Sequence, residues 1–278
     1  MKKTNDPEII IKPQDTNLFL DFSEIWRYHE LLYILAWRDI KVRYKQTALG
    51  VAWAILQPII TMIIFTIFFG KLAKIPSAEL PYSLFVLCGL VFWTFFSGAL
   101  THASNSMIDN ESVVKKVYFP KIILPISSIV TSSIDFVINF IILLIFAVFL
   151  GFIPSLWIFL VVPFALVLAS ITIAGIGLFL SSFNVKYRDV RYILPFFTQI
   201  LMFLTPVIYP LSIVSPINRY IMAINPMTSV IESVRLVFSG GSFIDPLLLL
   251  ISAISTGFIF FIGLIYFRRT ERFFADIV

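Results

Sequence analysis

The chain of 278 residues is 59% hydrophobic but only 13% charged, and its formal net charge is +5. Its mean hydropathy is +0.96, whereas soluble domains carry roughly 25% charged residues, so the composition excludes an ordinary soluble protein and favours a membrane protein. One cysteine, Cys88, allows no disulfide within the chain, and with only His29 and His102 as histidines we expect no metal site.

Residues 1–21 are polar and lack the apolar core of a signal peptide, so we expect a cytoplasmic tail. Residues 22–48 predict an amphipathic helix with Asp21 and Glu24 capping its start. Such a helix suits the membrane interface, as an anchor alone or as one that also contacts a partner subunit or gates a cytoplasmic entrance. Its apolar or ring-bearing side chains at helical spacing are Phe22, Ile25, Trp26, His29, Leu32, Tyr33, Ala36, Trp37 and Ile40.

The region 51–267 predicts an all-α transmembrane domain. About 20 mainly apolar residues are needed to cross the hydrocarbon core, which is about 30 Å thick. Pro125 and Pro163 indicate broken or interfacial beginnings for the third and fourth spans. Residues 268–278 would form a second cytoplasmic tail. The six segments that qualify as spans are 51–70, 82–103, 122–150, 156–183, 193–212 and 246–267.

The basic residues predict the orientation of the spans. With the N-terminus in the cytoplasm, 17 of the 21 Lys and Arg residues lie on the cytoplasmic side, as the positive-inside rule requires. Both termini are then cytoplasmic. Anionic lipids of the inner leaflet attract such an excess, so we expect no nucleic-acid partner. The four basic residues on the other side are Lys71, Lys74, Arg219 and Arg235.

The sequence offers little catalytic chemistry. It contains no G-x-x-x-x-G-K-[ST] loop, so we expect no ATP hydrolysis by this chain. Asp135 is the one acid in the predicted spans, and it lies among Thr131, Ser132, Ser133 and Asn139. It is either hydrogen-bonded for structural reasons or functional. An ion-coupled carrier usually shows more intramembrane charges, which leaves a pore-forming subunit driven by another protein.

Two charged islands interrupt the apolar sequence on the cytoplasmic side. In 109–121 either Asp109 or Asn110 can start a short helix that Pro120 stops. The second island is NVKYRDVRY, residues 184–192, with charges of both signs around two tyrosines. Each island is either a solvated loop or a docking surface for the driving partner.

Five motifs in order resemble the permease subunits of ABC-2 type exporters (type V ABC exporters), in particular the branch that exports O-antigen, capsule and teichoic acid polysaccharides. The resemblance covers about residues 20–275. The motifs are WRDIKVRYKQTALGVAWAILQP (37–58), ESVVKKVYFPK (111–121), NVKYRDVRYILPF (184–196), TPVIYP (205–210) and NPMTSVIESVR (225–235).

The resemblance implies a homodimer of six-span subunits in the inner membrane, docked on two copies of an ATPase subunit that binds ATP and Mg. No cofactor is then expected in this chain. It also implies that the first island is a coupling helix and the second island another contact with the ATPase. The residues expected to couple are Asp109, Asn110, Glu111, Val113, Val114, Lys116, Val117, Tyr118, Lys186, Tyr187, Arg188 and Asp189.

Aromatic residues at helical spacing are candidates for a glycan channel, because sugar rings pack their C–H faces on aromatic faces. Membrane aromatics also commonly face lipid or a neighbouring helix, and that alternative stays open. Pro206 and Pro210 would bend the fifth span beyond these residues. The channel candidates are Phe85, Phe92 and Phe96 on the second span, and Phe196, Gln199, Phe203 and Tyr209 on or after the fifth.

Two further sets complete the prediction. Arg38, Lys41, Arg43 and Lys45 either bind the diphosphate of a polyprenyl-linked glycan or only anchor the chain at the membrane surface.

The connection 213–245 is implied by the resemblance to form two short re-entrant helices of a periplasmic gate; a loop packed on the bundle is the alternative. In it Asn225 and Pro226 can start a helix, and Glu232 and Arg235 can pair.

We therefore expect a permease that exports a lipid-linked polysaccharide across the inner membrane. The alternative within the family is an exporter of a lipid or drug. The alternative from another class is a membrane-embedded glycan-processing enzyme centred on Asp135.

Overall fold

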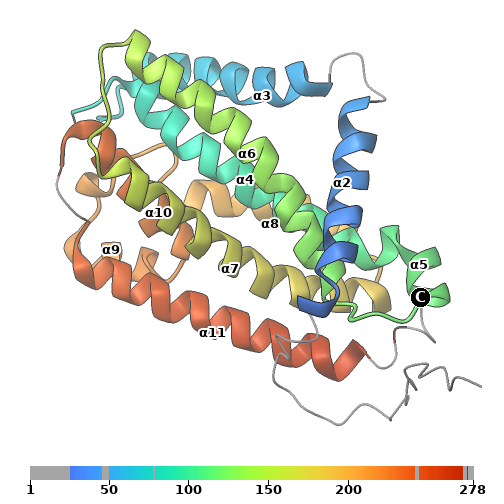
Figure 1. The fold of residues 1–278 in the computed structure, drawn as a ribbon. Helices are drawn as coiled ribbons and strands as arrows, with labels where there is room; N and C mark the ends of the chain where they lie inside the picture. The colour runs from blue at the N-terminus through green and yellow to red at the C-terminus, as the bar shows by residue number, and fades with distance from the viewer. Residues whose placement is uncertain (1–25, 46–49, 78, 242–243, 272–273, 275–278) are drawn as a thin grey trace, which may run out of the picture.

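The computed structural model describes residues 26–45, 50–77, 79–241, 244–271 and 274, and these residues form helices and connections with no strand among them (Figure 1). The predicted all-α fold is confirmed. The elements are α2 (His29–Lys45), α3 (Gly50–Phe65), the π-helix η1 (Thr66–Leu72), α4 (Tyr82–Asp109), α5 (Glu111–Lys116), α6 (Ile123–Phe149), α7 (Ile158–Lys186), α8 (Val190–Leu204), the 3₁₀ helix η2 (Leu211–Ile213), α9 (Pro216–Met222), α10 (Pro226–Ser239) and α11 (Pro246–Glu271).

Helix α4 is the central helix of the bundle. It contacts α3, α6, α7, α8 and α10, and 78% of its apolar stretch is buried within the chain. Buried residues occupy all of its sides, as expected of a helix surrounded by other helices. Small residues bring α7 close, since a Cβ added to Gly177 would lie 2.8 Å from the Cβ of Ala103.

Helices α7 and α11 cross at two glycines. A Cβ added to Gly263 of α11 would overlap the carbonyl oxygen of Gly175 on α7. We expect Gly263→Ala to destabilise the purified protein by about 1–3 kcal/mol, because the helices must separate, and thermal unfolding measures this. Gly257→Ala is the matched control on the same helix, since a Cβ there meets no atom within 4 Å. Equal unfolding temperatures for the two variants would contradict this crossing.

Five helical segments in the described residues are long and apolar enough to cross a membrane: Ile55–Leu72, α4, α6, α7 and α11. The predicted span 193–212 requires a correction. Helix α8 has 15 residues and is about 22 Å long, which is shorter than the hydrocarbon core. It ends at Leu204 because Thr205 is extended, the conformation that a following proline favours.

Helices α6 and α7 are continuous, although the sequence indicated broken beginnings. Pro125 lies in the first turn of α6, where its missing N–H has no helical partner to lose. Pro163 lies inside α7, and the helix continues through it. Helix α6 is therefore continuous over 27 residues, and helix α7 over 29 residues.

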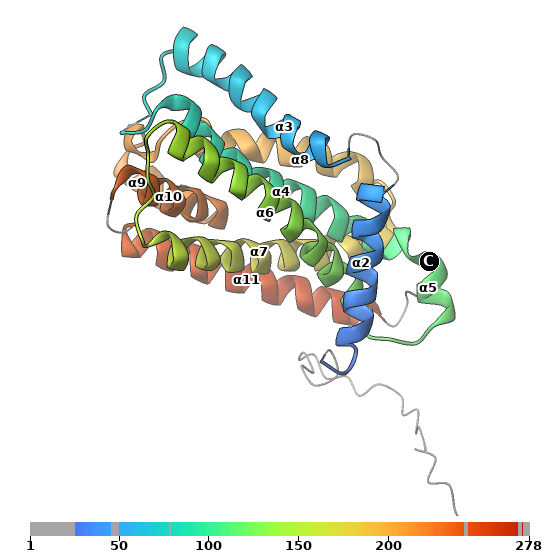
Figure 2. The ribbon, with the colours of Figure 1, turned by 45° about the horizontal axis from the view of Figure 1, so that its top comes forward.

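Helices α9 and α10 form the connection between the fifth and sixth predicted spans. They are bent by 112° at a short break, as two re-entrant helices or one broken span would be. Helix α10 packs on α4, α7 and α11, and most of its residues are buried. Figure 2 shows α9 and α10 together at one end of the bundle. The connection is thus helical and inserted between other helices.

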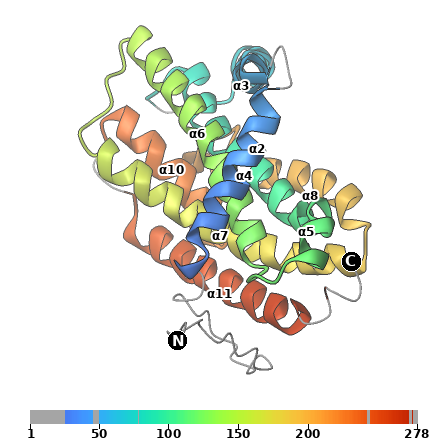
Figure 3. The ribbon, with the colours of Figure 1, turned by 45° about the vertical axis from the view of Figure 1, so that its right-hand side comes forward.

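Helix α2 crosses the opposite end of the bundle, where α5 also lies (Figures 1 and 3). It packs on α6 and α3 through Leu35 and Ala36, whereas Trp26, Tyr33 and Trp37 are exposed. The predicted apolar face is thus divided between the bundle and the outside. The outward aromatic residues suit a membrane interface, which stays a prediction. The expected cap and residues 22–25 and 46–48 lie outside the described residues.

Candidate functional site

Helix α5 is the short helix predicted in the first charged island. It spans Glu111–Lys116 with Asn110 directly before it, so the predicted start agrees with the structure. The helix ends at Lys116, earlier than the expected stop at Pro120, because Val117 is extended. Lys115 pairs with Glu111 one turn earlier at 2.7 Å. The hydrogen bond and charge of Lys115 lower the pKa of Glu111. The helix is therefore charged along its outer side and stabilised by a local ion pair.

The apolar residues of this island do not form one surface. Val114 is 4% exposed and packs in a cluster with Met107 and Phe119. Val117 and Tyr118 are 54% and 71% exposed, because the backbone turns extended at Val117. Val114 therefore anchors α5 to the bundle, while Val117 and Tyr118 are the residues presented outward. Val114 was among the residues expected to couple, and this burial corrects that expectation for it.

The two charged islands lie next to each other in the structure. Arg191 of the second island pairs with Asp109 of the first at 3.6 Å. Asn184 donates to the Ser104 carbonyl oxygen at 3.1 Å and to the Asn105 side chain at 3.0 Å. Together the islands form one exposed polar surface at the end of the bundle. The other predicted residues of the second island, all exposed, are Lys186, Tyr187, Arg188 and Asp189.

Three predicted channel residues are buried inside the subunit. Phe85, Phe92 and Phe96 are at most 2% exposed. Phe92 packs edge-on against Phe136 of α6, with ring centroids 4.8 Å apart. The helical spacing of these rings therefore reflects the central place of α4. The expectation that they line a channel is corrected, because this structure leaves their rings no open surface.

The predicted channel residues of α8 lie on an exposed face. Val190, Leu194 and Thr198 turn one side of α8 to the bundle, while Phe196 and Phe203 are 65% and 51% exposed. The exposed face includes Gln199. Tyr209 is half-buried, and its hydroxyl donates to the Phe203 and Leu204 carbonyl oxygens at 3.3 and 3.2 Å. Tyr209 thus caps the C-terminal end of α8 by donating to its last carbonyl oxygens, a role that its place in the sequence did not indicate.

A polar cavity of about 480 Å³ lies between α2 and the ends of α4 and α6. Arg38 donates to the Asp39 carboxylate at 2.7 Å and to Asn110 Oδ1 at 2.7 Å. It therefore joins α2 to the residue that starts α5. The lining residues include Arg38, Asp39, Arg43, His102, Asp109, Asn110 and Thr131.

Asp135 lines a second cavity deeper in the bundle. Its two carboxylate oxygens accept hydrogen bonds from Arg43 and Tyr44 of α2. Burial and the neighbouring carboxylate raise the pKa of Tyr44, so its hydroxyl stays a donor. Asp135 lies 12 residues into α6, about 18 Å along the helix. The sequence singled out Arg43 and Asp135 separately, but the contact between them joins segments too distant for sequence spacing to reveal.

The four predicted entrance residues do not act as a group. Only Arg38 and Arg43 line the polar cavity. The Lys41 ammonium lies 5.4 Å from the centre of the Trp37 ring, and Lys45 is exposed at the end of α2. Two of the four basic residues are thus placed beside a cavity that a polar headgroup could enter.

The predicted gate residues lie on α10. Asn225 caps this helix by accepting a hydrogen bond from the Met227 N–H at 3.1 Å, with Pro226 as the first residue, so the predicted helix start is confirmed. Glu232 and Arg235 pair at 3.7 Å, as predicted. Arg235 is 4% exposed, and its guanidinium donates to backbone carbonyls of α4 and of the segment after α8. Sequence spacing gave no sign of those contacts.

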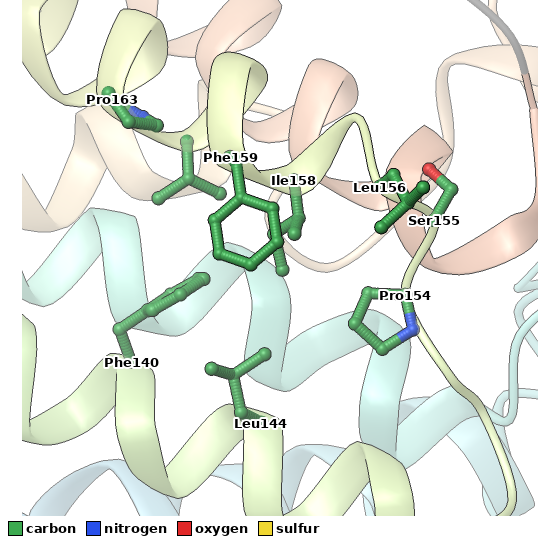
Figure 4. A pocket seen from close by; sticks show the side chains of 9 residues that line it. Phe140, Leu144, Pro154, Ser155, Leu156, Ile158, Phe159 and Pro163 are labelled. Atoms are coloured by element: carbon green, nitrogen blue, oxygen red, sulfur yellow. The ribbon is translucent and has the colours of Figure 1, made fainter.

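An apolar cavity of about 400 Å³ lies between α6 and α7 at the end of the bundle away from α5. Figure 4 shows the rings of Phe140 and Phe159 and the side chain of Leu144 around the same space. Its walls are almost entirely carbon and offer no acid, base or cation. Among the described residues as a whole, no group of three His, Cys, Asp or Glu side chains is placed to hold a metal ion.

Residues 30–239 match the family described as ABC-2 type transporter. An O-antigen export system permease protein RfbA of Klebsiella pneumoniae is 28% identical over 90% of this chain and 95% of its own length. One of Myxococcus xanthus is 29% identical over 90% and 96%. The polysialic acid transport protein KpsM of Escherichia coli is 24% identical over 84% and 91%. The family match spans most of the chain, and with the helical membrane bundle it leads to one conclusion: this chain belongs to the ABC-2 type transporter family.

Proposed function

We propose that this chain is the permease subunit of an ATP-binding cassette exporter that moves a polysaccharide through the membrane. The observation that carries the proposal is similarity over 95–96% of the length of two O-antigen export permeases. The bundle agrees with it, because the apolar helices α3, α6 and α7 pack on a buried α4, and the two charged islands lie together at one end. The substrate class rests on the names of these relatives.

The energy would come from a separate ATPase subunit that docks on the polar end. The support is the pairing of the two islands through Arg191 and Asp109, which places α5 beside the start of α8. Movement of α5 would reach α2 through the bond of Arg38 to Asn110. Val117 and Tyr118 would supply the apolar centre of the contact, and the charged residues around them its rim.

Two copies of the chain would form the working permease. The exposed faces of α3 and α8 support this proposal, since Trp53 and Ile60 on α3 and Phe196 and Phe203 on α8 lack cover within the subunit. A second copy could face them and enclose an aromatic path for a glycan. Arg38 and Arg43 would then meet the diphosphate of a polyprenyl-linked substrate at the entrance. The orientation with 17 basic residues inside would place both termini in the cytoplasm of a bacterial cell.

Purification from the native membrane in mild detergent tests the proposal. We expect an ATPase subunit to co-purify in equal amount, and we expect surface polysaccharide to disappear when the gene for this chain is deleted. Recovery of the folded chain without an ATPase, together with unchanged surface polysaccharide, would overturn it. The enzyme alternative has less support, because both oxygens of Asp135 are held by Arg43 and Tyr44.

A further inference from the structure

A small polar cavity of about 200 Å³ lies inside the subunit between α3, α4 and α6. It is distinct from the exposed aromatic face of α8 and from the larger cavity at the end of the bundle, although His102 lines both cavities. Polar groups at membrane depth are costly and commonly functional. The lining residues that carry the argument are Gln57, Thr94, Ser97, Gly98, Asp135 and Asn139.

Asn139 is the clearest sign of a ligand. It is 7% exposed, yet its Oδ1 atom has no hydrogen-bond partner among the described residues. A buried amide oxygen left in this state costs about 1–3 kcal/mol. Asp135 does not relieve it, because both of its carboxylate oxygens act as acceptors and an ionised carboxylate has no hydrogen to donate to a second acceptor. The acceptor on Asn139 is therefore available to a donor that enters the cavity.

Gly98 supplies room for such a ligand. A Cβ added to it would meet no atom within 4 Å, although the neighbouring Ala99 and Leu100 are fully buried. Hydroxyl groups of Thr94, Ser97 and Ser132 and the amide of Gln57 lie around the same space, together with the rings of Phe95 and Phe136. Amides, hydroxyls and a carboxylate beside aromatic rings suit a neutral molecule with many hydroxyl groups and apolar C–H faces.

We propose that this cavity binds one sugar unit of the exported polysaccharide, with Asn139 Oδ1 accepting a hydrogen bond from a sugar hydroxyl. The proposal rests on the proposed function and adds a saccharide site within each subunit. The charges of the lining favour the sugar over the diphosphate here, since the described residues around this cavity include the carboxylate of Asp135 and no Lys or Arg. The site lies beyond the Arg43–Asp135 contact as seen from the larger cavity.

Cysteine labelling tests the site without relying on export. The native cysteine, Cys88, is fully buried, so Gly98→Cys introduces one accessible thiol. We expect a small hydrophilic maleimide to label this variant in the purified complex, and we expect polyprenyl-diphosphate-linked glucose or N-acetylglucosamine to slow the labelling at least fivefold. Polyprenyl diphosphate without sugar is the control lipid. Absence of labelling, or equal protection by the control lipid, would overturn the sugar site.

Substitutions that keep the fold provide the second measurement. Asn139→Leu removes an unsatisfied amide, so a purely structural role predicts unchanged or higher thermal stability and normal export. We expect Asn139→Leu to keep its thermal stability and to lower the surface polysaccharide at least tenfold. Gly98→Leu should have the same effect, because its side chain would fill the cavity. Gly257→Leu is the matched control, since a Cβ at Gly257 also meets no atom within 4 Å but this glycine lies on α11.

Normal export by Asn139→Leu and Gly98→Leu would overturn the sugar site and leave the proposed function intact. Failure of the proposed function would look different: the chain without substitutions would be purified with no ATPase subunit bound to it. The two failures are therefore distinguishable in the same set of preparations.

Discussion

Val117→Asp is expected to reduce surface polysaccharide at least tenfold while the permease remains folded in the membrane. Val117 is 54% exposed just after α5, beside Tyr118 at 71%. A carboxylate in the centre of a docking surface loses water without gaining a partner. A tenfold loss of affinity needs only about 1.4 kcal/mol, which is less than burying a charge costs. The measurement is the amount of ATPase that co-purifies, together with the surface polysaccharide of the cells.

Val117→Ile is the control for this variant, because it keeps an apolar side chain at the same place, and we expect near-normal export from it. Val114→Asp is a contrasting variant. Val114 is 4% exposed and packs against the bundle, so a charge there should lower the thermal stability of the subunit as well as export. Normal co-purification of the ATPase with Val117→Asp would show that the docking surface lies elsewhere.

Much of the fold could be predicted from hydropathy alone. Apolar runs of span length predicted α4, α6, α7 and α11. The polar residues at 109 and 110 predicted the start of α5. Helix α8 was predicted too long because its apolar run continues past the helix end at Leu204. Hydropathy reports affinity for lipid, whereas the helix ends where the prolines at 206 and 210 disfavour helical backbone.

The candidate site was less predictable, because it depends on contacts between distant segments. Helical spacing selected Phe92 on α4 and Phe196 on α8 equally well, yet one ring is buried and the other exposed. Spacing within a helix cannot state which neighbours cover it. The pairing of Arg43 with Asp135 spans 92 positions in the chain, so local pattern gave no access to it. Charge distribution, in contrast, located both islands correctly at one end.

Arg235 is a buried residue that ties α10 to its neighbours. Its guanidinium donates to the carbonyl oxygens of Phe85 at 3.2 Å, Pro206 at 2.5 Å and Val207 at 2.7 Å. It also lies over the Phe85 ring, 3.5 Å from the ring centre. Gly89 makes space for it, since a Cβ there would lie 3.0 Å from the guanidinium. One side chain therefore joins α10, α4 and the segment where α8 ends.

Arg235→Met is expected to destabilise the subunit by about 3–5 kcal/mol, the usual cost of removing one partner from a buried charged network. The three carbonyl oxygens would lose their donor, and Glu232 would lose the cation 3.7 Å away. Thermal unfolding of the purified protein measures the loss. Adding Glu232→Gln should recover part of it, because the second change removes the carboxylate that the first leaves without a cation.

Arg219→Met is the matched control for this prediction. Arg219 also donates to two backbone carbonyl oxygens, those of Val214 at 2.8 Å and Ser212 at 3.0 Å, but it is only partly buried. Water can replace its hydrogen bonds, so we expect a loss of about 1 kcal/mol. If both arginine variants unfolded at the same temperature, Arg235 would not be what holds α10 against α4 and the segment after α8. A larger loss at Arg235 that Glu232→Gln partly reverses would show that burial of the pair makes this contact decisive.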